Sequence, residues 1–178
     1  MKENIFTYLK LFNIISGLKE PYIAGKLLLE KQKKLAVAES CTGGLVSSLM
    51  TDVSGSSAYI QSNFVTYANE AKAKYLNVKP ETLEQYGAVS VQTAGEMVKG
   101  LLENTGCDYA LATTGIAGPT GGSEEKPVGL VYIGVGTKDE MHVHKYNVNP
   151  KLPRIIIKYL FAKEAIKLLI DILKEEAI

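Results

Sequence analysis

Apolar positions along the chain follow two different periods, and segments of the two kinds alternate. Short apolar runs are typical of buried strands, whereas apolar residues three or four positions apart are typical of helices that bury one face. The apolar runs predict strands at 34–38, 59–67, 108–114, 129–136 and 141–147. The helical spacing predicts helices at 22–32, 43–52, 69–76, 80–86, 90–104 and 152–176.

The order of these elements predicts the fold class. Helices alternate with strands early in the chain, which favours parallel strands, and the last two strands follow one another like a hairpin. We therefore expect an α/β protein, a three-layer α/β/α domain with a mixed β-sheet. Ligands of such folds collect at the carboxyl ends of strands, so the segments after strands 34–38 and 108–114 are expected to face one crevice.

The first 20 residues are a separate feature. Apolar residues recur at helical spacing between Ile5 and Ile15, and polar residues interrupt the segment too often for a membrane span. The segment also lacks a signal-peptide cleavage pattern. We expect a helical extension at 1–20, which Pro21 separates from a single domain at 21–178.

Composition narrows the classes of function. The chain has 178 residues, enough for one domain with its own core, and a formal net charge of +1, which creates no strong field for nucleic acid or an anionic membrane. Its two cysteines, Cys41 and Cys107, form no Cys-x-x-Cys pair, which favours a reducing compartment. We expect a cytoplasmic protein with no nucleic-acid or membrane partner.

The stretch ESCTGG, residues 39–44, has a serine where a strand gives way to a helix. Unpaired N–H groups at a helix start can hold an oxyanion beside a serine hydroxyl, which is what acyl transfer needs. The alternative is that Ser40 or Thr42 simply caps the helix, and this stretch alone favours the cap.

Cys41 is the competing nucleophile in the same stretch. A reactive thiolate needs a base or a positive neighbour, and a buried, inert cysteine is the favoured interpretation. The only histidines, His142 and His144, alternate on a predicted strand and so face one side of it. The chain has neither a His-Glu-x-x-His motif nor a cysteine cluster, so we expect no metal and no cofactor.

Lys72 falls in the first turn of the predicted helix 69–76, where a cation opposes the helix dipole. A partly desolvated lysine there has a lowered pKa and can deprotonate a serine, directly or through a phenol such as Tyr67. The alternative is a solvated surface lysine beside a Glu70–Lys74 pair, and the pattern alone slightly favours it.

A glycine-rich stretch, TTGIAGPTGGSEEKPVG, follows the strand at 108–114. Consecutive N–H groups in such a stretch can form an anion-binding nest. It is neither a Walker loop nor a dinucleotide-binding fingerprint. The alternative is a flexible surface loop, but a long glycine-rich loop inside a compact domain is more often functional.

These three segments, in this order, resemble the C-terminal domain of the CinA family, which also occurs alone as nicotinamide-nucleotide amidase. The matching text is AESCTGGLVSSLMTDVSGSSAYIQSNFVTYANEAK, YGAVS and TTGIAGPTGGSEEKPVGLVYIGV, and it covers roughly residues 35–136. The resemblance implies a metal-independent hydrolase that converts nicotinamide mononucleotide to nicotinate mononucleotide and ammonia. It implies that Ser40 is the nucleophile and that Tyr67 and Lys72 complete the catalytic set, which reverses the two preferences stated above.

The catalytic set that the resemblance implies suggests a mechanism, and the chemistry of the glycine-rich loop predicts a substrate site. A neutral Lys72 takes the proton of Ser40, with Tyr67 relaying or orienting, and the acyl-enzyme is hydrolysed by water. N–H groups at Thr42, Gly43 and Gly44 are expected to hold the oxyanion. The substrate phosphate and ribose are expected on Thr114, Gly115, Gly118, Gly121, Gly122 and Arg154.

After Gly136 the chain departs from the family pattern. The family often has Gly-Asp-Arg before its last helix and another basic residue one turn later, whereas this chain reads NVNPKLPR. Arg154 corresponds to the second basic residue, and the first is absent or replaced by Lys151. The N-terminal domain of full CinA is not in this sequence, so we expect the activity of that half to be missing.

Two classes of function remain open at this point. The first is the amidase, with nicotinamide mononucleotide as its small-molecule partner. The second is a non-catalytic pyridine-nucleotide-binding or regulatory module with the same fold. For either class we expect a homodimer, because small α/β enzymes commonly form symmetric pairs.

Overall fold

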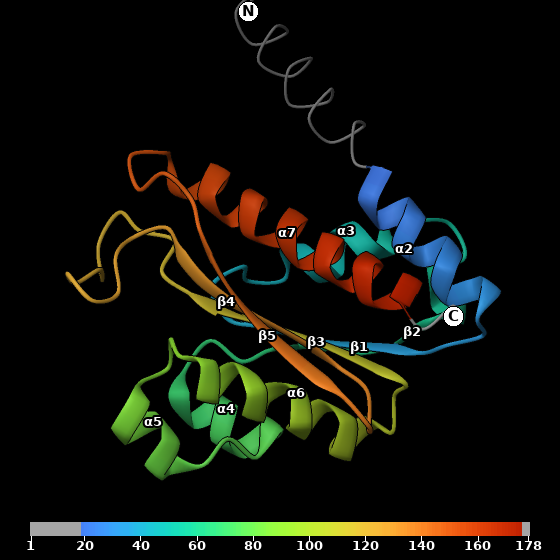
Figure 1. The fold of residues 1–178 in the computed structure, drawn as a ribbon, viewed down its shortest axis with the longest axis horizontal. Helices are drawn as coiled ribbons and strands as arrows, with labels where there is room; N and C mark the ends of the chain where they lie inside the picture. The colour runs from blue at the N-terminus through green and yellow to red at the C-terminus, as the bar shows by residue number, and fades with distance from the viewer. Residues whose placement is uncertain (1–18, 176–178) are drawn as a thin grey trace, which may run out of the picture.

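A computed structural model describes residues 19–175 (Figure 1). Its centre is one five-stranded sheet with the strand order β2-β1-β3-β4-β5. The first three strands in the chain pair in parallel, and the last two add to the sheet as antiparallel neighbours. The strands are β1 (Leu35–Glu39), β2 (Ile60–Val65), β3 (Tyr109–Gly115), β4 (Leu130–Gly136) and β5 (Met141–Asn147).

Helices cover both faces of this sheet (Figure 1). One layer holds α2 (Lys19–Glu30), α3 (Leu45–Thr51) and α7 (Arg154–Glu175). The other holds α4 (Asn69–Leu76), α5 (Pro80–Tyr86) and α6 (Val91–Thr105), and a 3₁₀ turn, Ser56–Ala58, precedes β2. The expected three-layer α/β/α architecture with a mixed sheet is confirmed.

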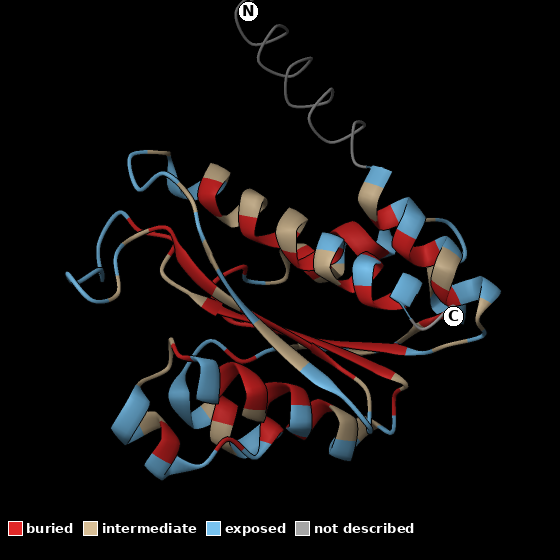
Figure 2. Ribbon diagram, viewed as in Figure 1, coloured by how far each residue is buried: buried red, intermediate tan, exposed pale blue. Residues whose placement is uncertain are grey.

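Side-chain alternation along the central strands builds two separate cores, both buried in Figure 2. Leu35 and Val37 of β1 point toward the layer of α2, α3 and α7, where they join a large apolar cluster. Ala36 and Ala38 point toward α6, and their small size lets that helix pack close to the sheet. The next residue on this second face of β1 is Ser40, so the strand itself directs that hydroxyl toward the layer of α4.

Two element boundaries differ from the sequence prediction. Pro21 lies inside α2, so the helix predicted at 22–32 begins earlier, at Lys19; a missing N–H costs little in a first turn. The helix α3 begins at Leu45, two residues late, because Gly43 and Gly44 have positive φ angles of 62° and 94°. Most of the predicted helical extension, residues 1–18, lies outside the described residues.

The register of the sheet brings two of the suspicious segments together. Glu39 at the end of β1 is the partner of Thr113 in β3, and the Ser40 N–H donates to the Thr113 carbonyl at 3.0 Å. The ESCTGG turn and the glycine-rich stretch therefore leave the sheet side by side, as expected for neighbouring parallel strands. Within residues 19–175, none of the helices has the length and apolar character needed to span a bilayer.

Candidate active site

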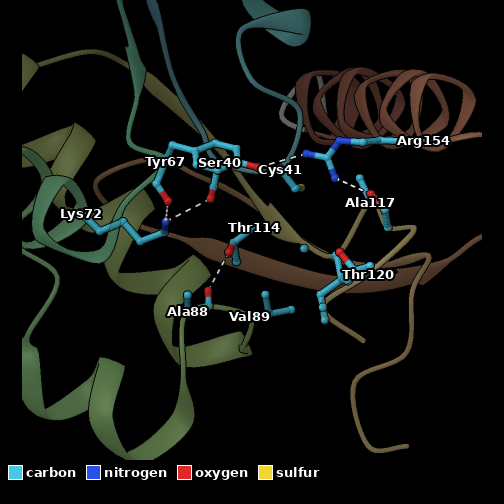
Figure 3. A pocket seen from close by; sticks show the side chains of 14 residues that line it. Ser40, Cys41, Tyr67, Lys72, Ala88, Val89, Thr114, Ala117, Thr120 and Arg154 are labelled. Atoms are coloured by element: carbon cyan, nitrogen blue, oxygen red, sulfur yellow. Dashed lines mark hydrogen bonds between the residues drawn. The ribbon is translucent and has the colours of Figure 1, made fainter. Parts of the chain in front are cut away.

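A pocket of about 260 Å³ opens at the carboxyl ends of β1 and β3 (Figure 3). Most of the residues expected from the sequence line it: Ser40, Tyr67, Lys72, Thr114, Gly115, Gly118, Gly121 and Arg154. Six further residues line it that were not expected to contact the substrate: Cys41, Ala88, Val89, Ile116, Ala117 and Thr120. Four expected residues, Thr42, Gly43, Gly44 and Gly122, are not among its lining residues in the described chain.

Lys72 reaches Ser40 directly. Its amine lies 3.0 Å from the Ser40 hydroxyl oxygen and also donates to the main-chain carbonyls of Thr66, at 2.8 Å, and Tyr67, at 3.1 Å. The Lys72 side chain is fully buried, so the alternative of a solvated surface lysine is wrong. Burial lowers the pKa of this amine from 10.5 to about 8, because desolvation penalises the charged form.

The three neighbours of the Lys72 amine are not equivalent. A carbonyl oxygen can only accept a hydrogen bond, whereas a serine hydroxyl can also donate one. A neutral amine carries two hydrogens and one lone pair. The carbonyls of Thr66 and Tyr67 can take the two hydrogens, which leaves the lone pair for the Ser40 hydroxyl. This geometry suits an amine that accepts a proton from Ser40.

The start of α3 is capped by Glu39. Its fully buried carboxylate accepts hydrogen bonds from the N–H groups of Gly44, Val46 and Ser47 and from the Ser47 hydroxyl. The alternative in which Ser40 or Thr42 caps this helix is therefore wrong. The carboxylate instead fixes the turn that carries the Ser40 side chain.

The expected oxyanion donors at Gly43 and Gly44 are already engaged. The Gly43 N–H donates to the Ser40 carbonyl at 3.1 Å, and the Gly44 N–H donates to Glu39 at 2.9 Å. The expectation that these two groups hold an oxyanion is wrong in this geometry. The N–H groups of Cys41 and Thr42, by contrast, take part in no backbone–backbone hydrogen bond among residues 19–175, although the Cys41 N–H interacts with its own thiol.

Cys41 lines the pocket, but its thiol is held in the neutral form. Burial raises the pKa of Cys41 to about 12, and the nearby Glu39 carboxylate acts in the same direction. The two histidines lie on β5, where His142 contacts the nearby Glu140 carboxylate at 2.8 Å. Neither histidine lines the pocket. The neutral thiol makes Cys41 a poor competitor to Ser40.

In the described part of the chain, no group of three His, Cys, Asp or Glu residues is arranged to hold a metal ion.

Arg154 and Tyr67 meet at the side of the pocket opposite Lys72 (Figure 3). The Arg154 guanidinium donates to the Tyr67 hydroxyl at 3.0 Å and to the Gly118 carbonyl at 2.6 Å. The Tyr67 phenol makes no hydrogen bond to Ser40 or Lys72 among the described residues, so this residue contacts the base only through its carbonyl. No carboxylate pairs with Arg154 in residues 19–175, which leaves its charge available to an anion.

A family model described as the CinA C-terminal domain matches residues 20–173. The chain belongs to the CinA family. A CinA-like protein of Endomicrobium trichonymphae is 53% identical over 125 residues, which are 70% of this chain and 29% of that protein. A CinA-like protein of Syntrophomonas wolfei is 50% identical over 147 residues, 83% of this chain and 35% of that protein. This chain spans about a third of the length of these relatives.

Solved structures of CinA proteins share the fold. The competence/damage inducible protein CihA of Agrobacterium tumefaciens superposes with a TM-score of 0.82 at 38% identity, over 87% of this chain and 95% of that one. A CinA superfamily protein of Escherichia coli gives a TM-score of 0.80 at 29% identity, over 86% and 90% of the two chains. The CinA fold of this chain is thus supported by both sequence and structure.

Of the described basic residues near the start of α7, only Arg154 is among the lining residues of the pocket. Lys151 is exposed and is not among the lining residues of the pocket. Lys158 instead lies one helical turn after Arg154 on α7, and its ammonium is close to Gly43, where an added Cβ would lie 3.2 Å from Nζ. Lys158 does not line the pocket either, and its four-residue spacing from Arg154 places both on one face of α7.

The glycine-rich stretch is held in place rather than free. Gly118 has a φ of +69°, and a Cβ there would lie 2.4 Å from a Val128 methyl carbon, so only glycine fits. The Lys126 ammonium donates to the Tyr86 carbonyl at 2.6 Å and fastens the stretch to the end of α5. The alternative of a freely flexible surface loop does not fit these contacts.

Proposed function

We propose that this CinA-family chain is an amidohydrolase that converts nicotinamide mononucleotide to nicotinate mononucleotide and ammonia. The observation that carries the proposal is the 3.0 Å contact between the buried amine of Lys72 and the hydroxyl of Ser40 at the wall of a pocket. A lysine with a pKa near 8 is partly neutral at physiological pH and is able to act as a general base. The resemblance of the ESCTGG and TYANEAK segments to the amidase supports the choice of substrate.

The first half of the reaction forms an acyl-enzyme. Lys72 takes the Ser40 proton while the serine oxygen attacks the carboxamide carbon, and a tetrahedral intermediate forms. The N–H groups of Cys41 and Thr42 directly follow the nucleophile in the chain and take part in no backbone–backbone hydrogen bond among the described residues, so we assign the oxyanion to them. One such donor contributes about 3–4 kcal/mol to transition-state stabilisation.

The intermediate then collapses with the proton returned to the leaving group. The Lys72 ammonium gives its proton to the amide nitrogen, the carbon–nitrogen bond breaks, and ammonia leaves. Water next attacks the Ser40 ester and gives one proton to Lys72. When the ester bond breaks, that proton passes to the Ser40 oxygen and the free enzyme is restored. No oxidant, reductant or cofactor is consumed.

The basic pair and the glycine-rich stretch provide the phosphate and ribose end of the site. Arg154 and Lys158 lie on one face of α7, and two cations suit a phosphate monoester that carries close to two negative charges. Gly118 and Gly121 allow close backbone approach at the same end of the pocket. Tyr67 contributes through its carbonyl, which holds Lys72, and through its hydroxyl, which holds Arg154.

Ammonia release from nicotinamide mononucleotide tests this proposal. We expect Ser40→Ala and Lys72→Arg each to lower kcat by about 10³-fold or more, because guanidinium stays charged and cannot accept the proton. Cys41→Ser is the matched control and should retain activity, since its thiol is neutral. Binding of the mononucleotide without turnover by the wild-type protein would favour the regulatory module instead.

A further inference from the structure

The end of β3 brings a second hydroxyl beside the nucleophile. Glu39 and Thr113 are register partners, so the residues that follow them, Ser40 and Thr114, are neighbours on adjacent strands. Side chains alternate along a strand, and the alanines at 38 and 112 belong to the core under α6. Ser40 and Thr114 therefore point to the same side of the sheet, and both line the pocket.

The single hydrogen of the Thr114 hydroxyl is already committed. It donates to the main-chain carbonyl of Ala88 at 2.6 Å, a short hydrogen bond in a residue that is 1% exposed (Figure 3). A hydroxyl has one hydrogen and two lone pairs. With its hydrogen held by Ala88, Thr114 presents only acceptor capacity to a ligand in the pocket.

We propose that Thr114, which the sequence assigned to the phosphate and ribose, is instead a specificity-determining residue that accepts a hydrogen bond from the amide nitrogen of the substrate. A carboxamide has two N–H donors, so one can meet the Thr114 oxygen while its carbon faces Ser40. The carboxylate of the acid product has no hydrogen to donate at the same position. Its oxygen would face the Thr114 oxygen, and two acceptors form no hydrogen bond. The inference rests on the proposed amidase function and extends it: the site distinguishes the amide substrate from its acid product.

The same contact favours the forward reaction. As Lys72 returns its proton to the leaving nitrogen, that nitrogen carries more hydrogen and more positive charge. Thr114 and Ala88 both line the pocket, and the Thr114 oxygen and the Ala88 carbonyl both accept, so the leaving nitrogen is placed beside them. Once ammonia has left and water has added, the acid product loses the contact and is released.

Thr114→Val tests this inference, because valine keeps the shape of threonine and removes the oxygen. We expect kcat/KM for nicotinamide mononucleotide to fall about 10- to 100-fold, the effect of leaving a polar group of the substrate without its partner. Thr114→Ser is the matched control; it keeps the hydroxyl and should stay within about threefold of wild type.

A loss of kcat/KM alone would also follow if Thr114 merely supported the fold, so the decisive readout is selectivity. In the wild type, the inhibition constant of nicotinate mononucleotide should greatly exceed the KM of the amide. In Thr114→Val this ratio should fall by at least about tenfold, whereas a structural role would leave it unchanged. Melting temperatures show whether the variant is folded, and Thr114→Ala replaces it if it is not.

The outcomes separate the two proposals. An unchanged ratio in a folded Thr114→Val enzyme overturns the role of Thr114 and leaves the amidase standing. Equal losses in the serine and valine variants overturn it as well, because serine retains the acceptor. A wild-type protein that releases no ammonia overturns the proposed function, and the inference built on it falls with it.

Discussion

Lys72 meets Ser40 through an amine whose pKa is lowered to about 8 by burial, so one ionisation should control the rate. The base is active when neutral, and the neutral fraction of a lysine rises as the pH rises through its pKa. We expect kcat/KM to increase about tenfold per pH unit below pH 8 and to level off above it. The measurement is the pH profile of ammonia release under subsaturating substrate.

The control for this profile is the Cys41→Ser variant. The Cys41 thiol of the wild type has a pKa of about 12, far from the pH near 8 at which the rate should reach half its maximum. Removal of the thiol should therefore leave that half-maximal pH unchanged. A profile that falls through pH 8 would contradict a neutral Lys72 as the base, and a profile that is flat from pH 6 to 10 would do the same.

Tyr67 divides its two polar groups between two partners. Its carbonyl accepts from Lys72 and its hydroxyl accepts from Arg154, so Tyr67→Phe removes only the second contact. We expect Tyr67→Phe and Arg154→Ala to raise KM, the latter by about tenfold, and to change kcat by less than about threefold, because both act on a binding cation. Steady-state kinetics at pH 8.5 separate the two parameters.

The opposite outcome for Tyr67 would have a clear meaning. A kcat loss in Tyr67→Phe as large as that in Lys72→Arg would show that the phenol moves a proton between Ser40 and Lys72, as the family resemblance implies. The Tyr67 hydroxyl would then have to break its hydrogen bond with Arg154 and turn toward Ser40 and Lys72 when the substrate binds.

At the scale of elements, the β1–α3 connection depends on one buried carboxylate. Glu39→Gln replaces an acceptor of four hydrogen bonds by an amide whose nitrogen cannot accept, so at least one N–H at the start of α3 loses its partner. We expect a loss of about 1–3 kcal/mol in the free energy of unfolding and a kcat/KM lower by about tenfold or more, because the turn carrying Ser40 shifts.

Ser47→Ala is the control for Glu39→Gln. It removes one donor to the same carboxylate and leaves the three N–H contacts intact, so about 0.5–1.5 kcal/mol of stability should be lost with little change in kcat/KM. Chemical denaturation and ammonia release measure the two effects. Equal kcat/KM in wild type and a folded Glu39→Gln would remove Glu39 from the positioning of Ser40.

The helix α4, which carries Lys72, is held against α6 at Gly100. A Cβ at Gly100 would lie 1.8 Å from the Leu76 carbonyl oxygen, which is backbone and cannot turn aside. We expect Gly100→Ala to cost about 2–3 kcal/mol of stability and to lower kcat by moving Lys72 away from Ser40. Thermal melts and turnover at saturating substrate measure these losses.

Gly95 on the same helix is the matched control. A Cβ there would meet the flexible end of Met141, at 3.3 Å, and a Val143 methyl carbon at 3.9 Å, so Gly95→Ala should keep full activity and change stability by less than about 1 kcal/mol. Similar losses in both variants would mean that helix propensity, rather than the contact with α4, explains the effect.

The sequence predicted these elements better than it predicted their ends. The sequence pattern was sufficient for the strand that ends at Glu39, which is buried on both faces, and for the helix that holds Lys72, which buries Lys72 and Leu76 on one face. It was not sufficient for the cap of α3, because serine and threonine are the usual caps and the Glu39 carboxylate reaches the helix only through a turn of two left-handed glycines. The direction of the Tyr67 phenol was equally inaccessible, since it depends on Arg154, 87 residues away.

At the scale of the molecule, the site exists only where the two helical layers meet the sheet. Ser40 follows a central strand, Lys72 comes from the α4 layer, and Arg154 opens α7 in the other layer (Figures 1 and 3). The two cores that pack these layers onto the sheet therefore also hold the elements that carry these three side chains. A change that loosens either layer should lower activity before it unfolds the chain.

Removal of residues 1–18 tests whether this arrangement is complete. The family match begins at residue 20, α2 begins at Lys19, and the pocket residues identified above lie between Ser40 and Arg154. We expect a chain starting at Lys19 to melt cooperatively and to keep kcat/KM within about twofold of the full chain, because catalysis depends on local geometry. If activity is lost, size-exclusion chromatography of the full chain and of the chain starting at Lys19 distinguishes two explanations. A loss of activity with a smaller assembly would show that the extension joins two copies, and a loss without a change in assembly would show that it completes the pocket.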